Sequence, residues 1–144
     1  MKVIKHFVQE FGVRSIKPRK MGNQYAFYVP TIDAANFFGK ELEVFPLRYI
    51  DENEELGLVF YLDMPEDYFY KPYSVYKLKR PYKLADGEPK MTYSYYVPIP
   101  NKMLSDIGIE NGVPRIIEMK GGYLPDGKKV ILIQRKKVRT EKRW

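Results

Sequence analysis

Short β-prone runs rich in apolar residues recur along this chain, and turn-forming residues separate them. The segments with this pattern are 13–17, 25–29, 44–50, 56–62, 74–79, 91–97, 115–119 and 129–134. Runs of this length bounded by Gly, Pro, Asn and Asp are typical of strands joined as hairpins. The turns are expected at 18–23, 51–55 and around Asp86-Gly87, and in the last hairpin across Gly121-Gly122 and Asp126-Gly127. The pattern therefore predicts a mostly β protein.

Two short helices are predicted between these strands. Residues 32–38 follow Thr31, a plausible N-cap, and end at Gly39. Residues 100–107 begin with a proline, which is tolerated at the first helical position, and end at Gly108. Each helix is expected to follow a Val-Pro step and to connect one hairpin to the next.

The N-terminal segment has a different spacing. Ile4, Phe7, Val8 and Phe11 recur at i, i+3, i+4 and i+7, and Gly12 follows them. This spacing favours a short amphipathic helix. An added edge strand is the competing interpretation.

An internal repeat relates the two parts of the chain. Tyr25-Ala26-Phe27-Tyr28-Val29-Pro30 matches Tyr93-Ser94-Tyr95-Tyr96-Val97-Pro98 at an offset of 68 residues, with four of six positions identical. Residues 13–17 resemble 75–79, and residues 58–62 resemble 130–133, in the same order. An ordered series of matches with insertions in the turns is what a duplicated unit leaves.

One such unit alone leaves strand edges unpaired and an apolar face uncovered. Two units can cover each other, so the sequence predicts one pseudo-twofold barrel in which the halves exchange strands. The predicted parts are an N-terminal extension (1–12), a first half (13–62), a linker (63–73), a second half (74–134) and a basic tail (135–144).

The second half carries a family resemblance. Tyr95-Tyr96-Val97-Pro98-Ile99-Pro100, followed by Leu104-Ser105-Asp106-Ile107-Gly108-Ile109-Glu110-Asn111-Gly112, resembles the AbrB/MazE/SpoVT swapped-hairpin DNA-binding family. In the first half, Val13-Arg14-Ser15-Ile16, Gly22 and Val29-Pro30 have similar spacing. The resemblance implies a single-chain, pseudo-twofold, swapped-hairpin β-barrel with short helices. It also implies a DNA-binding face built from the first turn of each half.

Charge is unevenly distributed. The chain has a net charge of +7 and a pI near 9.4. Residues 31–70 contain two basic and ten acidic residues, whereas residues 128–144 contain eight basic and one acidic residue. Clustered positive charge favours a polyanionic partner.

The basic residues at the equivalent turns and in the tail are the candidate nucleic-acid contacts. Long cationic side chains on projecting loops suit phosphate contact, and arginines also suit guanine edges. The candidates are Arg14, Lys17, Arg19 and Lys20 in the first half, Lys77, Lys79, Arg80, Lys83 and Lys90 in the second, and Arg135, Lys136, Lys137 and Arg139 in the tail. The predicted function is a transcriptional regulator that binds double-stranded DNA.

Alternative interpretations stay open at this point. An antitoxin-like or inhibitor protein would use the acidic face at 41–67 and the basic tail to bind a protein partner. Tyrosines interleaved with lysines over 68–83 could stack on single strands, although cross-strand packing is the commoner use of such residues. The acidic stretch 51–55 is expected to be a solvated hairpin tip, because it lacks EF-hand spacing for a divalent metal.

Enzymatic chemistry is not indicated. The chain has no Cys and one His, His6, and it shows neither a Gly-rich phosphate loop nor a metal-ligand pattern. We therefore expect no catalytic residues, no metal and no cofactor. Because no apolar run approaches the ~20 residues that span a bilayer, we expect no membrane association and a cytoplasmic location. The oligomeric state is expected to be a monomeric pseudo-dimer or a homodimer.

Overall fold

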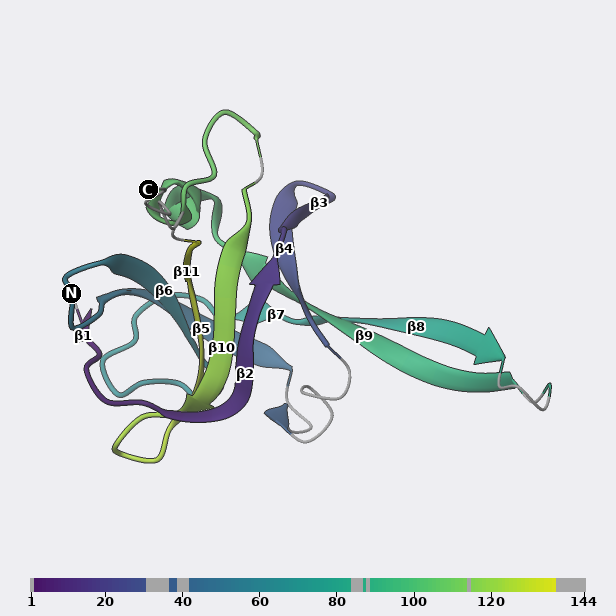
Figure 1. Ribbon diagram of the computed structural model, residues 1–144, viewed down its shortest axis with the longest axis horizontal. Coiled ribbons are helices and arrows are strands. Elements are labelled where there is room, and N and C mark those ends of the chain that lie inside the picture. Colours follow the sequence, from purple (N-terminus) through teal and green to yellow (C-terminus); the bar gives the residue numbers. More distant parts are fainter. Residues whose placement is uncertain are drawn as a thin grey trace, which may run out of the picture.

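The computed structural model describes residues 2–30, 37–38, 42–83, 87, 89–113 and 115–136. The chain is mostly β, as the sequence predicts, and its strands form two sheets (Figure 1). The elements are β1 (Lys2–Val3), β2 (Val8–Ile16), β3 (Arg19–Met21), β4 (Gln24–Val29), β5 (Glu43–Ile50), β6 (Leu56–Tyr61), β7 (Tyr73–Ser74), β8 (Tyr76–Lys83), β9 (Pro89–Ile99), the 3₁₀ helix η1 (Asn101–Ile107), β10 (Ile117–Tyr123) and β11 (Lys129–Arg135).

Both sheets combine strands from the two parts of the chain. The larger, curled sheet has the order β1-β5-β6-β11-β10-β2, with β7 paired to β5, and the smaller sheet has the order β3-β4-β9-β8. In the smaller sheet β4 lies antiparallel to β9, and in the larger sheet β6 lies antiparallel to β11. Each sheet is therefore joined at its centre by a pair of strands that are far apart in sequence.

The main hydrophobic core lies between the two sheets. Phe27 on β4 and Phe60 on β6 are fully buried, and their rings meet edge to face with centroids 5.2 Å apart. Met103 and Ile107 on η1 belong to the same cluster. The helix therefore closes this core at the end where β9 finishes.

A second core covers the opposite face of the larger sheet. Tyr49, Tyr61 and Leu132 are buried there against Ile4 from the N-terminal segment and Tyr68 from the segment after β6. Burial on both faces explains why β6 and the central part of β11, Val130–Ile133, are continuously apolar instead of alternating.

The predicted N-terminal helix is wrong, and the strand alternative is closer. Residues 2–3 and 8–16 form β1 and β2. Ile4 packs in the second core while Phe11 packs in the main core, so the two side chains serve opposite faces of the larger sheet. One helical stripe would have placed both on the same side.

The predicted pairing of residues 13–17 with 25–29 is also wrong. β2 leaves the first hairpin and pairs with β10, with Ile16 opposite Ile117. β3 is the strand that pairs with β4, and its turn is Gly22-Asn23 instead of the whole of 18–23. The change of sheet falls at Pro18, which has no N–H for a strand ladder.

Gly121 and Gly122 were expected in a turn, but they lie inside β10. A Cβ on Gly121 would lie 1.9 Å from the Phe11 ring, and one on Gly122 would lie 2.1 Å from the Val8 carbonyl oxygen. The register between β10 and β2 shifts at the same place. These glycines allow close approach of β2 at a β-bulge.

Other predicted elements are confirmed. The strands expected at 44–50, 56–62, 91–97 and 129–134 are β5, β6, β9 and β11. The helix expected at 100–107 is η1, which Gly108 ends in a left-handed conformation at φ 85°. Of the helix expected at 32–38, only Phe37 and Phe38 belong to the described residues, and both are buried.

Candidate nucleic-acid interface

The β8–β9 hairpin projects from the body as a two-stranded ribbon (Figure 1). β4 accompanies β9 only as far as the pair Val29 and Tyr95. Beyond it, the described pairing of β9 is with β8 alone, from Leu78 opposite Ser94 to Lys83 opposite Pro89. Six residue pairs at about 3.4 Å each make this ribbon about 20 Å long.

Cations lie on this ribbon against aromatic rings. Lys77 and Lys79 are exposed on β8, opposite Tyr95 and Tyr93. The Lys77 ammonium lies 4.1 Å from the centroid of the Tyr93 ring, which restricts the side chain without neutralising its charge. The remaining candidates of this region are placed by their backbone: Arg80 and Lys83 on β8, and Lys90 on β9.

The first hairpin is shorter and lies against the body. Arg19 and Lys20 on β3 are exposed, and the Arg19 guanidinium carbon lies 5.4 Å from the centroid of the Tyr96 ring. Lys17 is exposed just before β3. Gly22 forms the turn with a φ of 62°, a conformation that glycine adopts without strain.

The structure brings these basic residues into one sheet but not into one cluster. Because β4 and β9 are antiparallel, the first turn lies beside the Ile99 end of β9, while the second lies beyond the Pro89 end. The two turns therefore occupy opposite ends of the smaller sheet. Arg14 lies apart from both, exposed on β2 opposite Met119 in the larger sheet.

The base of the tail lies elsewhere on the molecule. Arg135 ends β11 and lies over Gly108, where a Cβ would be 2.7 Å from its Nε. Arg135 and Lys136 line a hollow of about 440 Å³ together with Glu55 and Asp106. The adjacent carboxylates reduce the local positive field. Lys137 and Arg139 lie outside the described residues.

The acidic tip between β5 and β6 has a structural role. One carboxylate oxygen of Asp51 accepts hydrogen bonds from the backbone N–H groups of Asn53 and Glu55, and the other accepts one from the Gln134 side chain. Among the described residues, no group of three or more His, Cys, Asp or Glu is arranged to hold a metal ion.

An ion pair that the sequence analysis missed fixes η1 to the larger sheet. The Arg48 Nε donates to Asp106 over 2.6 Å, and the same guanidinium donates to the Lys102 carbonyl over 3.1 Å. Arg48 and Asp106 are 58 residues apart, and neither stands in a recognisable motif. No sequence signal marks them as partners.

Comparisons with known proteins add no relative: no family model, no curated protein and no solved structure matches this chain. Within the part of the chain that the structure describes, helices long and apolar enough to cross a membrane are absent.

Proposed function

We propose that this protein binds double-stranded DNA, with the β8–β9 ribbon as its principal contact and the β3–β4 hairpin as a second one. The observation that carries the proposal is the ribbon itself, a projecting two-stranded element on which Lys77 and Lys79 are exposed. Proteins place such ribbons in the major groove, which is about 12 Å wide.

The charge of the ribbon fits this use. Residues 76–94 contain five basic residues and two acidic ones, the latter both in the turn segment at Asp86 and Glu88. Contacts of this kind neutralise phosphates and release counterions, so they give affinity that depends strongly on salt. A transcriptional regulator would add base contacts from the arginines to this electrostatic term.

We further propose that the fold is a single-chain, AbrB-like swapped-hairpin barrel with a pseudo-twofold axis. The strand register supports it. Tyr28 and Tyr96, which the sequence repeat equates, lie directly opposite each other across β4 and β9, with ring centroids 5.6 Å apart. The cross-strand pair Lys20 and Tyr25 on the first hairpin also has a counterpart on the second, the pair Lys79 and Tyr93, in which Tyr93 is the residue that the repeat equates with Tyr25.

A second pair of strands agrees with that axis. The repeat aligns Val59 with Ile131 and Phe60 with Leu132. In the larger sheet, Val59 lies opposite Leu132 and Phe60 lies opposite Ile131. A local twofold axis between these two cross-strand pairs would exchange Val59 with Ile131 and Phe60 with Leu132, which are the residues that the repeat aligns. Duplication of a dimeric ancestor would produce this arrangement.

The separation of the turns suits two contacts on one duplex. The first turn lies at one end of β9 and the ribbon turn at the other, and eleven residues of β9 span about 37 Å. One turn of B-DNA is about 34–36 Å, the usual spacing of half-sites for a twofold protein. We therefore expect a pseudo-palindromic target.

The experiment is a fluorescence-anisotropy titration of duplex DNA at several salt concentrations. The ribbon variant carries Lys79→Ala, Arg80→Ala and Lys83→Ala. The control variant carries Lys5→Ala, Lys71→Ala and Lys128→Ala, which remove the same charge from other parts of the surface. We expect the ribbon variant to lose affinity and to lower the log–log salt slope by about 2.7, at about 0.9 per phosphate contact.

Equal losses in the two variants would mean that net charge, not the ribbon, attracts DNA. Tighter binding of single strands than of duplex would favour stacking on the tyrosines instead. Either result would overturn the proposal.

A protein-interaction module is the second candidate function. It is favoured by apolar side chains exposed on the segment after β6, where Met64 is 63% and Phe69 is 88% exposed. Apolar exposure beside the acidic residues of 41–67 suits a protein partner better than a polyanion. In that case the ribbon variant would keep its activity.

A further inference from the structure

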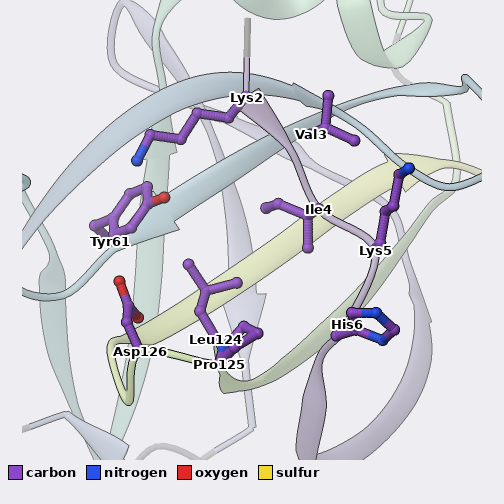
Figure 2. Close-up of a pocket in the computed structure, with 9 residues that line it drawn as sticks. All are labelled: Lys2, Val3, Ile4, Lys5, His6, Tyr61, Leu124, Pro125 and Asp126. Carbon is purple, nitrogen blue, oxygen red and sulfur yellow. The ribbon is translucent and has the colours of Figure 1, made fainter.

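A hollow of about 500 Å³ lies between the N-terminal segment and the turn that joins β10 to β11 (Figure 2). Ile4 and Leu124 form its apolar floor, and Lys2, Tyr61 and Asp126 gather at one side. Its size is within the range of sites that bind small molecules, about 300–1,000 Å³. The residues come from three distant segments, so sequence reasoning had no signal for them.

Tyr61 is the unusual residue in this hollow. The side chain is only 1% exposed, and its hydroxyl points into the hollow (Figure 2). Among the described residues no hydrogen bond to this hydroxyl is seen, and no buried side-chain oxygen or nitrogen there lacks a partner, so the hydroxyl is open to the hollow. A hydroxyl that is open to the hollow is available to donate or accept a hydrogen bond with a molecule bound there.

Two opposite charges flank this hydroxyl. The Lys2 ammonium lies 4.8 Å from the centroid of the Tyr61 ring, and the Asp126 carboxylate reaches toward the same ring (Figure 2). Asp126 accepts one hydrogen bond from the backbone N–H of Lys128. No ion pair joins Lys2 to Asp126. A positive and a negative group thus lie in one hollow without neutralising each other.

We propose that this hollow binds a small zwitterionic, amphipathic molecule, of which a free apolar α-amino acid is the simplest. Its carboxylate would meet the Lys2 ammonium and accept a hydrogen bond from Tyr61. Its ammonium would meet Asp126, and its side chain would lie on Ile4 and Leu124. A simple carboxylate would face Asp126 without compensation, and a simple amine would face Lys2 in the same way.

The remaining polar residues of the hollow lie on its other side. Figure 2 shows the Lys5 ammonium and the His6 ring directed away from Tyr61. These groups therefore do not compete for the carboxylate position. The hollow lies beside the second core, whereas the ribbon belongs to the smaller sheet. Because the two sites are separate, binding of a small molecule to the hollow can be measured in the absence of DNA.

Isothermal titration calorimetry of the whole chain with L-leucine and L-phenylalanine tests the proposal. The comparison ligands are the matching amine, isoamylamine, and the matching acid, isocaproate. We expect an amino acid to bind more tightly than both. We expect Tyr61→Phe, which keeps the ring, to weaken binding about 2- to 12-fold, the range of one hydrogen bond.

Asp126→Asn should reduce the preference for the amino acid over the acid, while Asp63→Asn, a change of the same kind at an exposed position elsewhere, should leave it intact. The proposal is overturned if neither amino acid binds at about 10 mM, if the acid or the amine binds as tightly, or if Tyr61→Phe binds unchanged. Failure of DNA binding by the ribbon would not affect any of these readouts.

Discussion

The larger sheet and the β8–β9 ribbon are built from the same kind of strand but are packed in opposite ways. The larger sheet is covered on both faces, so β6 is buried at five of its six positions and β11 is buried from Val130 to Ile133. On the ribbon, Lys77, Leu78 and Lys79 are all exposed, and Leu78 keeps 40% of its surface accessible. Stability therefore resides in the sheet.

The ribbon needs another explanation. An antiparallel pair of strands without packing is marginal on its own and exposes an edge. The fold can hold this unpacked strand pair because β9 continues as a central strand of the smaller sheet, where Val97 and Ile99 are fully buried. We infer that the projecting part is maintained for a partner. Changes in the two regions should thus separate stability from binding.

The largest effect is expected from Phe60→Ala. The Phe60 ring is fully buried between the sheets and packs on Phe27, so its removal leaves a cavity and costs about 3–5 kcal/mol. Leu78→Ala on the ribbon should cost far less. Urea unfolding followed by circular dichroism measures both. Comparable losses would show that the ribbon is part of the packed core.

Gly122→Ala should follow, with a cost of about 1–3 kcal/mol. Its Cβ would lie 2.1 Å from the Val8 carbonyl oxygen, which the backbone of β2 holds in place. Gly87→Asn in the ribbon turn is the matched change. Gly87 has a φ of 84° and open space around it, a conformation that asparagine tolerates. Unfolding midpoints that fall equally in both variants would remove the distinction between the regions.

The sequence predicted local structure where short-range signals decide it. Thus η1 follows from Pro100 and the stop at Gly108, and β5 and β6 follow from β-prone runs on either side of a turn. It failed where the choice depends on distant partners. The helical spacing of Ile4, Phe7, Val8 and Phe11 gave no indication that Ile4 and Phe11 would pack in two different cores.

Of the candidate sites, too, one part could be predicted from the sequence and another part could not. The basic residues of the ribbon and of the first hairpin could be named from their charge and from the repeat. Their separation to opposite ends of one sheet follows from the antiparallel register of β4 and β9, which composition does not encode. The hollow around Tyr61 could not be predicted, because its lining assembles only when the N-terminal segment folds over the larger sheet.

Alkaline pH should weaken the packed region before the ribbon is affected. Burial, and then the neighbouring Tyr73 and Tyr70, raise the pKa of Tyr68 from 10.0 to about 12. Above pH 10 an unfolded tyrosine loses its proton while native Tyr68 keeps it, so the unfolded state is favoured as pH rises toward 12.

Urea midpoints measured from pH 9 to 11 give the test, since this window spans the ordinary tyrosine pKa of about 10. Tyr68→Phe should make the decline in stability shallower, because phenylalanine has no proton to lose. A decline of the same steepness in that variant would assign the alkaline sensitivity to another group.

The smallest effects are expected from single charges that lie opposite the two tyrosines equated by the repeat, Tyr25 and Tyr93. Lys79 on the ribbon and Lys20 on the first hairpin are both exposed and face corresponding tyrosines, so neither Lys79→Ala nor Lys20→Ala should change the urea midpoint appreciably. For duplex binding, each should lower the log–log salt slope by about 0.9 if both hairpins touch phosphates. A change in slope for Lys79→Ala alone would restrict the interface to the ribbon. A change in slope for Lys20→Ala alone would reverse the assignment of the principal contact, because the short β3–β4 hairpin, and not the projecting ribbon, would then bind the DNA phosphates.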